Sequence, residues 1–458
     1  MKKVVIQGLG FVGSATAVAI SSKLNKNNKP LFDVTGIDLN NRIGKIRVNQ
    51  INSGNFPFKT LDHSISKEAK KSFMRGNLNA SFSSDVYSNA DIIIISINYD
   101  LDRKNKKKLN LSNFKKSCSV VAKKISKNTL IIVQSTVAPG TCEKIIYPIL
   151  NKNLVKRKIN PKLVWLAHSY ERVMPGKNYL QSITNYWRVY SGINDISAKK
   201  CANFLKKIIN TKKYPLTKLD STTSSEIAKI LENSYRAVNI AFIEEWSRFC
   251  EEINIDLFEI ISAIKKRPTH SNLMKPGFGV GGYCLTKDPL FAKVSANQIL
   301  NINDHKFFYS TNAVKINNQM PNVSLNKLIS YFKNDLKNKS ILLMGASYRE
   351  EIADTRYSPS EIFYKNAMKK GINVDVHDPM VSYWDELSLK IYNCIPDIKK
   401  YDAIVFAVQH MQYKKINFNN LIKNKSKILV FDANNVLSSS QIKTIKSKRN
   451  ISFVSIGR

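Results

Sequence analysis

A glycine-rich stretch around one cysteine holds the residues best suited to chemistry. Residues 277–289 read GFGVGGYCLTKDP, in which Cys284 follows four glycines and precedes Lys287 and Asp288. Glycines at this density let the backbone approach a ligand closely. A cysteine acts as a nucleophile in its thiolate form, which a neighbouring ammonium group favours, and Asp288 could serve as a base or hold a water. The alternative is a glycine-rich turn around a buried cysteine that acts as a small apolar side chain.

The N-terminal 40 residues predict a dinucleotide-binding turn. A short buried strand is expected at residues 4–6, and the fingerprint G-x-G-x-x-G follows at Gly8, Gly10 and Gly13. A helix and a second apolar run come next, and that run ends at Asp38. The glycines let a pyrophosphate lie against the helix N-terminus, whose N–H groups favour anions. Asp38 would accept the ribose hydroxyls and thereby select NAD over NADP.

Further apolar runs predict more strands of the same sheet. Residues 91–96 and 130–133 are continuous apolar segments, as is typical of parallel strands buried on both faces. The second run leads into QSTVAPGT at 134–141, whose hydroxyl and turn residues we expect at the carboxyl edge of the sheet, where cofactors bind. Another strand is predicted at 163–167 and leads towards Glu171. On its own, Glu171 could equally be a surface carboxylate.

One long helix is predicted over residues 221–253, which contain no Pro or Gly and carry apolar residues at helical spacing. Lys229 and Asn233 lie one turn apart and share a face, although such pairs are also common on solvated faces. Apolar residues occupy much of the helix circumference, so we expect burial between domains or subunits. After a connecting helix and linker, a second, smaller doubly wound domain is predicted from strands at 340–345, 374–379, 402–406 and 427–432. It lacks a glycine triplet, which fits a mononucleotide better than a second dinucleotide.

Composition narrows the possible functions. The chain has 458 residues, enough for two to four domains, and 43% hydrophobic residues indicate a globular protein. A net charge of +38 fits a nucleic-acid surface, a membrane surface or anionic small ligands. The lysines are scattered beside abundant Asn and Ile, as in proteins of AT-rich genes, which favours composition drift together with anionic ligands as the origin of the charge. The basic run at 103–108 is expected to be a solvated loop.

Cysteine and histidine spacing argues against disulfides and metals. The six cysteines form no C-x-x-C pair and the six histidines no H-E-x-x-H spacing. We therefore expect free thiols in a reducing compartment and no metal. No apolar stretch is long enough to span a bilayer, so the expected location is the cytoplasm.

Together these motifs resemble the nucleoside-diphosphate-sugar dehydrogenase family, which comprises UDP-glucose, UDP-N-acetylglucosamine/mannosamine and GDP-mannose dehydrogenases. The resemblance runs from Lys3 almost to Arg458. Besides 277–289 it rests on STVAPGT at 135–141, on EIAK and the following NSYRAV at 226–238, and on SYR with the later DTRYSP at 347–359.

The resemblance implies an α/β fold in three parts. These are an N-terminal NAD-binding Rossmann domain at 1–195, a central domain at 196–325 that carries the long dimerisation helix and the nucleophile loop, and a C-terminal Rossmann-like, UDP-binding domain at 326–458. It implies NAD-dependent four-electron oxidation of the C6 alcohol of a nucleotide sugar, with a UDP-sugar expected, to the uronate. Cys284 would form a thiohemiacetal and then a thioester. The implied partners are the nucleotide sugar and a second copy of the chain, with no specific nucleic acid and no membrane.

The same resemblance assigns site residues. Cys284 matches the nucleophile, Lys229 the oxyanion-stabilising group, Asn233 and Asp288 the groups that position water and exchange protons, Glu171 the water-activating carboxylate and Thr136 the hydroxyl near the nicotinamide. The cofactor-binding set is Gly8, Gly10, Phe11, Val12, Gly13, Asp38, Arg42, Ser96, Thr136 and Lys287. The substrate-binding set is Glu171, Arg172, Lys229, Asn233, Arg267, Lys275, Gly277, Gly281, Tyr348 and Arg349.

Several positions depart from the family pattern. Tyr170 stands where the family has proline, and INYD at 97–100 replaces its V-P-T-P segment. Arg42 is one residue short of the family spacing from Asp38. Arg267 fits the family arginine only with a one-residue shift, and His270 stands at the ungapped position.

The sugar and two other function classes stay open at this stage. Lys287 resembles the UDP-glucose branch, whereas the G-V-G-G spelling and ERV at 171–173 resemble the N-acetylhexosamine branch. A two-electron 3-hydroxyacid-type dehydrogenase is one alternative, but it would need neither Cys284 nor the third domain. A basic nucleic-acid-binding protein is the other, although the sequence has no recognition-helix or stacking motif.

Overall fold

The computed structural model describes residues 1–102, 108–422 and 427–458. Most of the basic run predicted to be a solvated loop lies outside these ranges. The described chain divides into two compact units. Unit 1 comprises residues 1–232 and 291–306, and unit 2 comprises residues 233–290 and 307–458. The three-part division with borders at 195 and 325 stays a prediction.

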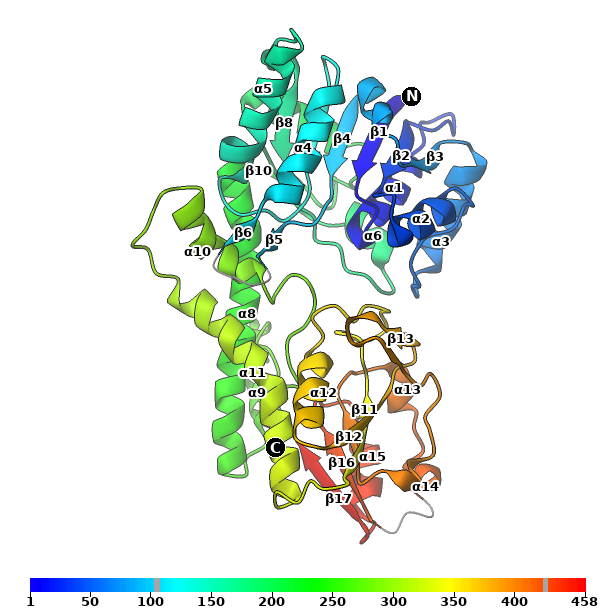
Figure 1. Ribbon diagram of the computed structural model, residues 1–458, viewed down its shortest axis with the longest axis vertical. Helices are drawn as coiled ribbons and strands as arrows, with labels where there is room; N and C mark the ends of the chain where they lie inside the picture. Colours follow the sequence, from blue (N-terminus) through cyan, green and yellow to red (C-terminus); the bar gives the residue numbers. More distant parts are fainter. Residues whose placement is uncertain (103–107, 423–426) are drawn as a thin grey trace. The chain divides into compact units, whose positions relative to one another are not determined.

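Unit 1 is built on an eight-stranded sheet with the strand order β10-β9-β8-β7-β4-β1-β2-β3 (Figure 1). All neighbours pair in parallel except β8 and β9. The strand of four isoleucines at 92–95 is buried on both faces, as its continuous apolar sequence predicts. The elements are β1 Lys2–Gln7, α1 Phe11–Ser21, β2 Phe32–Ile37, α2 Arg42–Ile51, α3 His63–Met74, β3 Leu78–Ser81, β4 Ile92–Ile95, β5 Asp100–Leu101, β6 Leu109–Asn110, α4 Ser112–Lys124, β7 Leu130–Val133, α5 Tyr147–Lys156, β8 Trp165–His168, α6 Tyr179–Thr184, β9 Arg188–Gly192, α7 Asp195–Leu205 and β10 Leu216–Lys218.

Register places several of the predicted site residues along one edge of this sheet. Gln7 pairs with Ile37 and with Ile95, and Ile95 pairs with Val133, so four parallel strands end side by side. The segments that begin at 8, 38, 96 and 134 therefore leave the sheet at its carboxyl edge, the side on which open α/β sheets bind ligands.

Unit 2 contains a five-stranded, fully parallel sheet with the order β12-β11-β15-β16-β17. The predicted second doubly wound domain is thus confirmed, and its central strands are almost wholly buried. Its elements are α9 Leu257–Ile264, α11 Phe308–Tyr331, β11 Ser340–Met344, α12 Pro359–Lys369, β12 Asn373–His377, β13 Tyr383–Trp384, β14 Leu389–Lys390, β15 Ala403–Phe406, α13 Met411–Lys414, α14 Phe418–Leu421, β16 Ile428–Asp432, α15 Ser439–Lys446 and β17 Ile451–Ser455.

Two helices cross the border between the units. The long helix predicted at 221–253 is confirmed as α8, Thr222–Glu252, and α10 spans Asp288–Gln298. The part of α8 in unit 2 exposes a stripe of large apolar side chains at helical spacing, each of them about half exposed. We call Tyr235, Phe242, Trp246, Phe249 and Ile253, the residue that follows the last turn of α8, the α8 stripe.

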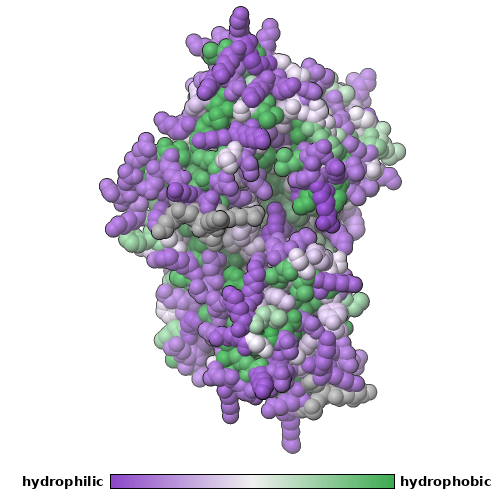
Figure 2. Space-filling view, in the orientation of Figure 1, coloured by the Kyte–Doolittle hydropathy of each residue, from purple (hydrophilic) through white to green (hydrophobic). Residues whose placement is uncertain are grey.

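The surface reflects the lysine-rich composition. Hydrophilic side chains spread over most of the face seen in Figure 2, and smaller apolar patches lie between them. Within the part of the chain that the structure describes, no helix has both the length and the apolar character needed to cross a membrane. The same residues contain no cluster of three or more His, Cys, Asp or Glu side chains able to hold a metal ion.

Candidate active site

The glycine fingerprint forms a tight turn between β1 and α1. Gly8 has a positive φ of 97°, and a Cβ atom there would overlap the carbonyl oxygen of Ser96. A Cβ atom on Gly13 would overlap the carbonyl oxygen of Gly8. Gly10 precedes α1 without a side-chain cap, so the first N–H groups of the helix are not capped by a side chain of that residue. This turn fits a dinucleotide pyrophosphate, which such N–H groups bind.

Asp38 follows β2 and carries the carboxylate expected at the cofactor ribose. One oxygen accepts from the N–H of Leu39 at 2.8 Å, and the other pairs with Arg47 at 3.1 Å. The cation beside Asp38 is therefore Arg47, whereas Arg42 is exposed at the start of α2. The two arginines lie five residues apart in α2 and therefore do not share a face of the helix, which explains why only Arg47 reaches Asp38. A cofactor role for Arg42 stays a prediction.

The segment that carries Thr136 is held on several sides. Ser135 Oγ accepts from the N–H of Ile97 at 2.9 Å and donates to its carbonyl at 2.7 Å. Tyr99 and Thr141 share a hydroxyl hydrogen bond of 2.9 Å, and Ser295 donates to the carbonyl of Pro139. Thr136 itself is half-buried. The loop at 97–100, a departure from the family pattern, thus supplies two of the groups that hold this segment.

Glu226 anchors the other end of this segment. It is wholly buried on α8 in unit 1, and its two oxygens accept from the N–H groups of Gly140 at 2.6 Å and Cys142 at 2.8 Å. Those donors belong to the start of the helical stretch that continues into α5. Burial raises the pKa of Glu226 to about 8, although these hydrogen bonds oppose the rise. Glu226 begins the EIAK motif at 226–229, but nothing nearby in the sequence indicates its hydrogen-bond partners.

Glu171 and Lys229 are brought together in unit 1 through the backbone. Lys229 is buried and donates to the carbonyl oxygen of Glu171 at 3.1 Å. The Glu171 side chain turns back to accept from the N–H of Val173. Tyr170, where the family has proline, lies under two cations, with Lys229 Nζ 5.4 Å and the Arg172 guanidinium 5.3 Å from its ring centre. Tyr170 therefore helps to place both side chains.

Arg172 is tied to two neighbours as well. Its Nε lies 3.1 Å from the Glu232 carboxylate, and its Nη1 donates to the carbonyl of Trp187 at 2.8 Å. These contacts fix the start of the segment that follows β8.

Asn233, Lys287 and Asp288 form one buried cluster in unit 2. Asp288 is 1% exposed, and its two oxygens accept from Asn233 Nδ2 and Lys287 Nζ, each at 2.8 Å. Lys287 Nζ also lies 4.3 Å from the ring centre of Tyr283. Asp288 is therefore committed to two donors, and it holds Lys287 in place one turn from Cys284.

Cys284 is exposed and ends the glycine-rich loop. Its carbonyl oxygen accepts from the N–H of Asp288 at 2.9 Å, which forms the turn into α10. Most other cysteines are buried, and burial raises the pKa of the Cys118 and Cys201 thiols to about 12. Since a thiol must ionise to attack, those two are inert at neutral pH. Cys284 and Cys394 are both exposed, and of these two Cys284 lies in the glycine-rich loop.

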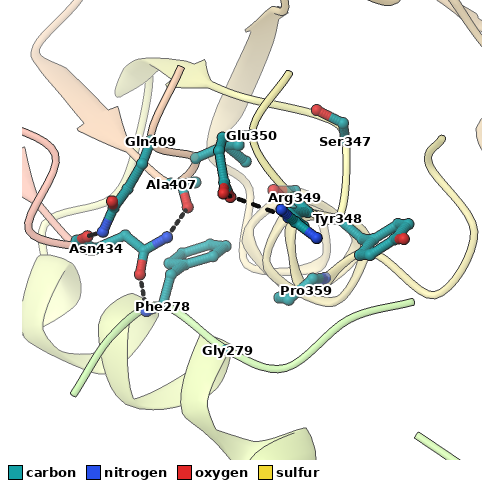
Figure 3. A pocket seen from close by; sticks show the side chains of 12 residues that line it. Phe278, Gly279, Ser347, Tyr348, Arg349, Glu350, Pro359, Ala407, Gln409 and Asn434 are labelled. Carbon is teal, nitrogen blue, oxygen red and sulfur yellow. Dashed lines mark hydrogen bonds and ion pairs between the residues drawn. The ribbon is translucent and has the colours of Figure 1, made fainter. Parts of the chain in front are cut away.

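A cavity of about 260 Å³ lies in unit 2 at the carboxyl edge of its sheet (Figure 3). Phe278 and Gly279 of the glycine-rich loop form one side, and Tyr348, Arg349 and Glu350 form another. The remaining lining residues are Ser347, Pro359, Ser360, Ala407, Val408, Gln409 and Asn434. Arg349 pairs with Glu350 at 3.3 Å and is about two-fifths exposed, so its charge is accessible to an anion.

A buried network below the cavity fixes the Arg349 segment. Asp378 accepts from the N–H groups of Ala346 and Ser347, both at 2.9 Å, and from His410 at 3.2 Å. Burial opposes ionisation of Asp378, but the His410 contact and the backbone donors outweigh it and lower its pKa to about 2. Asp378 falls within the strand predicted at 374–379, whereas no sequence pattern indicated a role for His410 or Asn434.

Two predicted substrate-binding cations lie elsewhere in unit 2. Arg267 and Lys275 are exposed in the segment after α9, and His270 is exposed beside them. Neither Arg267 nor Lys275 is among the residues that line the cavity in the described part of the chain. Their assignment stays a prediction.

Three domain models of one family match successive parts of the chain. They are the NAD-binding domain at residues 2–211, the central domain at 223–319 and the UDP-binding domain at 342–439 of the UDP-glucose/GDP-mannose dehydrogenase family. A UDP-N-acetyl-D-mannosamine dehydrogenase of Methanococcus maripaludis is 30% identical, over 96% of this chain and 94% of that protein. A Campylobacter jejuni protein of the same name is 25% identical, over 92% and 98%.

Solved structures share the fold. A UDP-D-ManNAc dehydrogenase from Pyrococcus horikoshii superposes with a TM-score of 0.83 and 24% identity, over 100% of this chain and 99% of that one. A UDP-glucose dehydrogenase from Pyrobaculum islandicum gives a TM-score of 0.80 at 18% identity, over 99% and 97%. With matches to all three domain models and a relative 30% identical over nearly its whole length, this chain belongs to the UDP-glucose/GDP-mannose dehydrogenase family.

Proposed function

We propose that this protein oxidises the C6 alcohol of a UDP-sugar to the carboxylate, with NAD as the oxidant and Cys284 as the covalent nucleophile. The observation that supports this most strongly concerns the glycine-rich loop of unit 2. Cys284 is exposed at the end of this loop, and Phe278 and Gly279 at its beginning line the cavity that contains Arg349. NAD, when bound at the Gly8 turn, supplies the hydride acceptor for each of two oxidations.

The residues of the chain divide the remaining chemistry. The C6 alcohol first loses a proton and a hydride, and this hydride is the one that NAD accepts in the first oxidation. The Cys284 thiolate then forms a C–S bond to the resulting C6 aldehyde, and the aldehyde oxygen takes up the negative charge as the alkoxide of the thiohemiacetal. Loss of a hydride from that carbon gives the thioester, and water then cleaves the C–S bond to release the carboxylate and the thiol. The tether keeps the aldehyde from escaping between the two oxidations.

The family resemblance assigns further roles that stay proposals. Lys229 would stabilise the oxyanion, and Glu171 would activate the hydrolytic water. Thr136 would lie beside the nicotinamide. Both oxygens of Asp288 already accept hydrogen bonds, which supports a role for Asp288 in positioning Asn233 and Lys287.

The cavity beside Arg349 is the proposed nucleotide site. The Arg349 guanidinium can donate charge-assisted hydrogen bonds to a diphosphate. The buried Asp378 carboxylate holds the backbone of Ala346 and Ser347, just before Arg349, in place. Binding of UDP, measured by calorimetry, should weaken at least about tenfold in Arg349→Ala, the loss expected for a charged hydrogen-bond donor. Unchanged UDP affinity would contradict this placement.

For the sugar we propose an N-acetylhexosamine. This extends to the chain what the names of two relatives say of them, since the proteins that are 30% and 25% identical over 96% and 92% of this chain are named UDP-N-acetyl-D-mannosamine dehydrogenases. The test is NADH formation against a panel of UDP- and GDP-sugars. Preference for UDP-glucose or for GDP-mannose would overturn the choice of sugar and leave the reaction class standing.

We also propose a homodimer built on unit 2. The α8 stripe borders a cavity of about 760 Å³, lined among others by Tyr235, Phe242, Phe308 and Tyr309, and the last two are strongly exposed. An apolar surface of this kind marks an interaction site. Light scattering at micromolar protein should give twice the chain mass of 52.0 kDa, and a monomer with full activity would contradict the proposal.

A further inference from the structure

The glycines of the nucleophile loop are required by the protein's own packing. A Cβ atom on Gly279 would lie 2.7 Å from Pro359, and one on Gly282 would lie 2.6 Å from the ring of Tyr348. A Cβ atom on Gly277 would overlap Oδ1 of Asn434. The loop backbone therefore lies directly against residues that line the proposed nucleotide cavity, and side chains would force it away.

Asn434 is the polar link between this loop and the sheet of unit 2. Its Oδ1 accepts from the N–H of Phe278 at 3.2 Å, and its Nδ2 donates to the carbonyl of Ala407 at 2.8 Å. Its own carbonyl accepts from Gln409 Nε2 at 2.7 Å. Figure 3 shows Asn434 joined to Phe278 on one side and to Ala407 on the other.

The backbone around Asn434 is held by hydrogen bonds to a buried carboxylate. Asn434 is the second residue after β16, and the buried Asp432 carboxylate accepts from the N–H groups of Val436 at 2.8 Å and Leu437 at 3.0 Å. Ala407 directly follows β15. The side chain thus bridges the ends of two buried neighbouring strands to the loop that carries Cys284 six residues after Phe278.

We propose that Asn434 is a positioning residue that couples occupancy of the nucleotide cavity to the placement of Cys284. Phe278 and Asn434 both line the cavity. A nucleotide that fills the cavity therefore packs against this hydrogen-bonded pair and holds the glycine-rich loop against Asn434. When the loop is held in this way, the Cys284 thiol is presented to the bound sugar and is less accessible to other reagents in solution. This role rests on the proposed function, because it requires a nucleotide in the cavity.

The test measures alkylation of Cys284 by iodoacetamide with and without UDP, followed by mass analysis of the peptide that carries residue 284. In the unaltered protein UDP should slow the alkylation several-fold. In Asn434→Ala the UDP effect should fall below about twofold, UDP affinity should drop less than tenfold, and the rate at saturating sugar should fall about tenfold to a hundredfold, as misplacement of a reacting group does.

A second variant reaches the same link from the loop side. Gly277→Ala keeps Asn434 and its bond to Ala407 but wedges a methyl group against Oδ1, so it should also remove the UDP effect. Gln441→Ala is the matched control, because Gln441 is a buried amide of the same unit that donates to two carbonyls, each at 3.0 Å, and lies outside the cavity lining. It should lose stability and keep the UDP effect.

The outcomes separate the two proposals. If UDP does not bind to the unaltered protein, the proposed nucleotide site is wrong. If UDP binds but leaves alkylation of Cys284 unchanged, or if Asn434→Ala keeps the full UDP effect, the coupling role is wrong and the proposed function stands. An equal loss of the UDP effect in Gln441→Ala would show general loosening of the unit and would also overturn the role of Asn434.

Discussion

Glu226 should make the stability of unit 1 fall as the pH rises. In the folded chain burial raises its pKa from 4.5 to about 8, so between these pH values the folded state keeps a proton that the unfolded state has lost. Stability then decreases with rising pH. Because a tenfold change in proton affinity is worth about 1.4 kcal/mol, the full effect between pH 4.5 and 8 is roughly 5 kcal/mol.

The charged and titratable groups that face Glu226 do not cancel this effect. Tyr99, Cys142 and Glu143 interact with its carboxyl. A Tyr or Cys that stays neutral offers no compensating positive charge, and Glu143 adds a like charge. The Cys142 thiol and the N–H groups of Cys142 and Gly140 lower the pKa of Glu226, and the value of about 8 already includes their effect.

The perturbation is Glu226→Gln, which removes the proton equilibrium at some constant cost, because an amide NH₂ must face one of the two N–H donors. Free energies of unfolding of both proteins should be compared by urea denaturation at pH 5, 7 and 9. The stability of the unaltered protein relative to the variant should fall by several kcal/mol over this range. Glu143→Gln is the control and should keep the pH dependence. A difference between the unaltered protein and Glu226→Gln that stays constant within about 1 kcal/mol would refute the reasoning.

Three more expectations concern the cofactor, the oxyanion group and assembly. NAD should be preferred to NADP by at least about tenfold in kcat/KM, because a 2′-phosphate would lie beside the Asp38 carboxylate, and equal turnover with NADP would count against this role. Lys229→Ala should lower kcat by about 10²- to 10³-fold, as loss of an oxyanion donor does, while thermal unfolding shows that the chain still folds; a change in KM alone would remove the assigned role. Trp246→Glu, in the α8 stripe, should convert the proposed dimer to monomers in light scattering, and a dimer that persists in this variant would place the interface elsewhere.

The sequence predicted the fold well because its signals are local. Continuous apolar runs such as 92–95 and 130–133 can be buried on both faces only in a parallel sheet, and the structure places them there. The 31-residue helix α8 contains no residue that would end it early. The turn at Gly8 and Gly13 was predictable because the backbone permits only glycine there.

The contacts of the candidate site were less accessible to sequence analysis, since they join residues far apart in the chain. Glu226 meets Gly140 across 86 residues, and Asn434 meets Phe278 across 156. The loop glycines suggested a ligand at the backbone, whereas the structure shows that the protein's own Tyr348 and Pro359 occupy that space. Arg47 was not predicted because it lies nine residues after Asp38, whereas Arg42 lies one residue short of the spacing of the family cation.

The most direct test of the covalent mechanism is NADH formed per UDP-sugar consumed, measured for the unaltered protein and for Cys284→Ser. The covalent mechanism predicts two NADH per sugar for the unaltered protein. For Cys284→Ser it predicts a rate lower by several orders of magnitude, with UDP binding retained, because serine is a far weaker nucleophile near neutral pH. A slowly hydrolysed sugar ester on the peptide that carries residue 284 would support the covalent mechanism further. If Cys284→Ser keeps even about a tenth of the turnover with two NADH per sugar, a free aldehyde hydrate carries the second oxidation and the covalent mechanism is wrong.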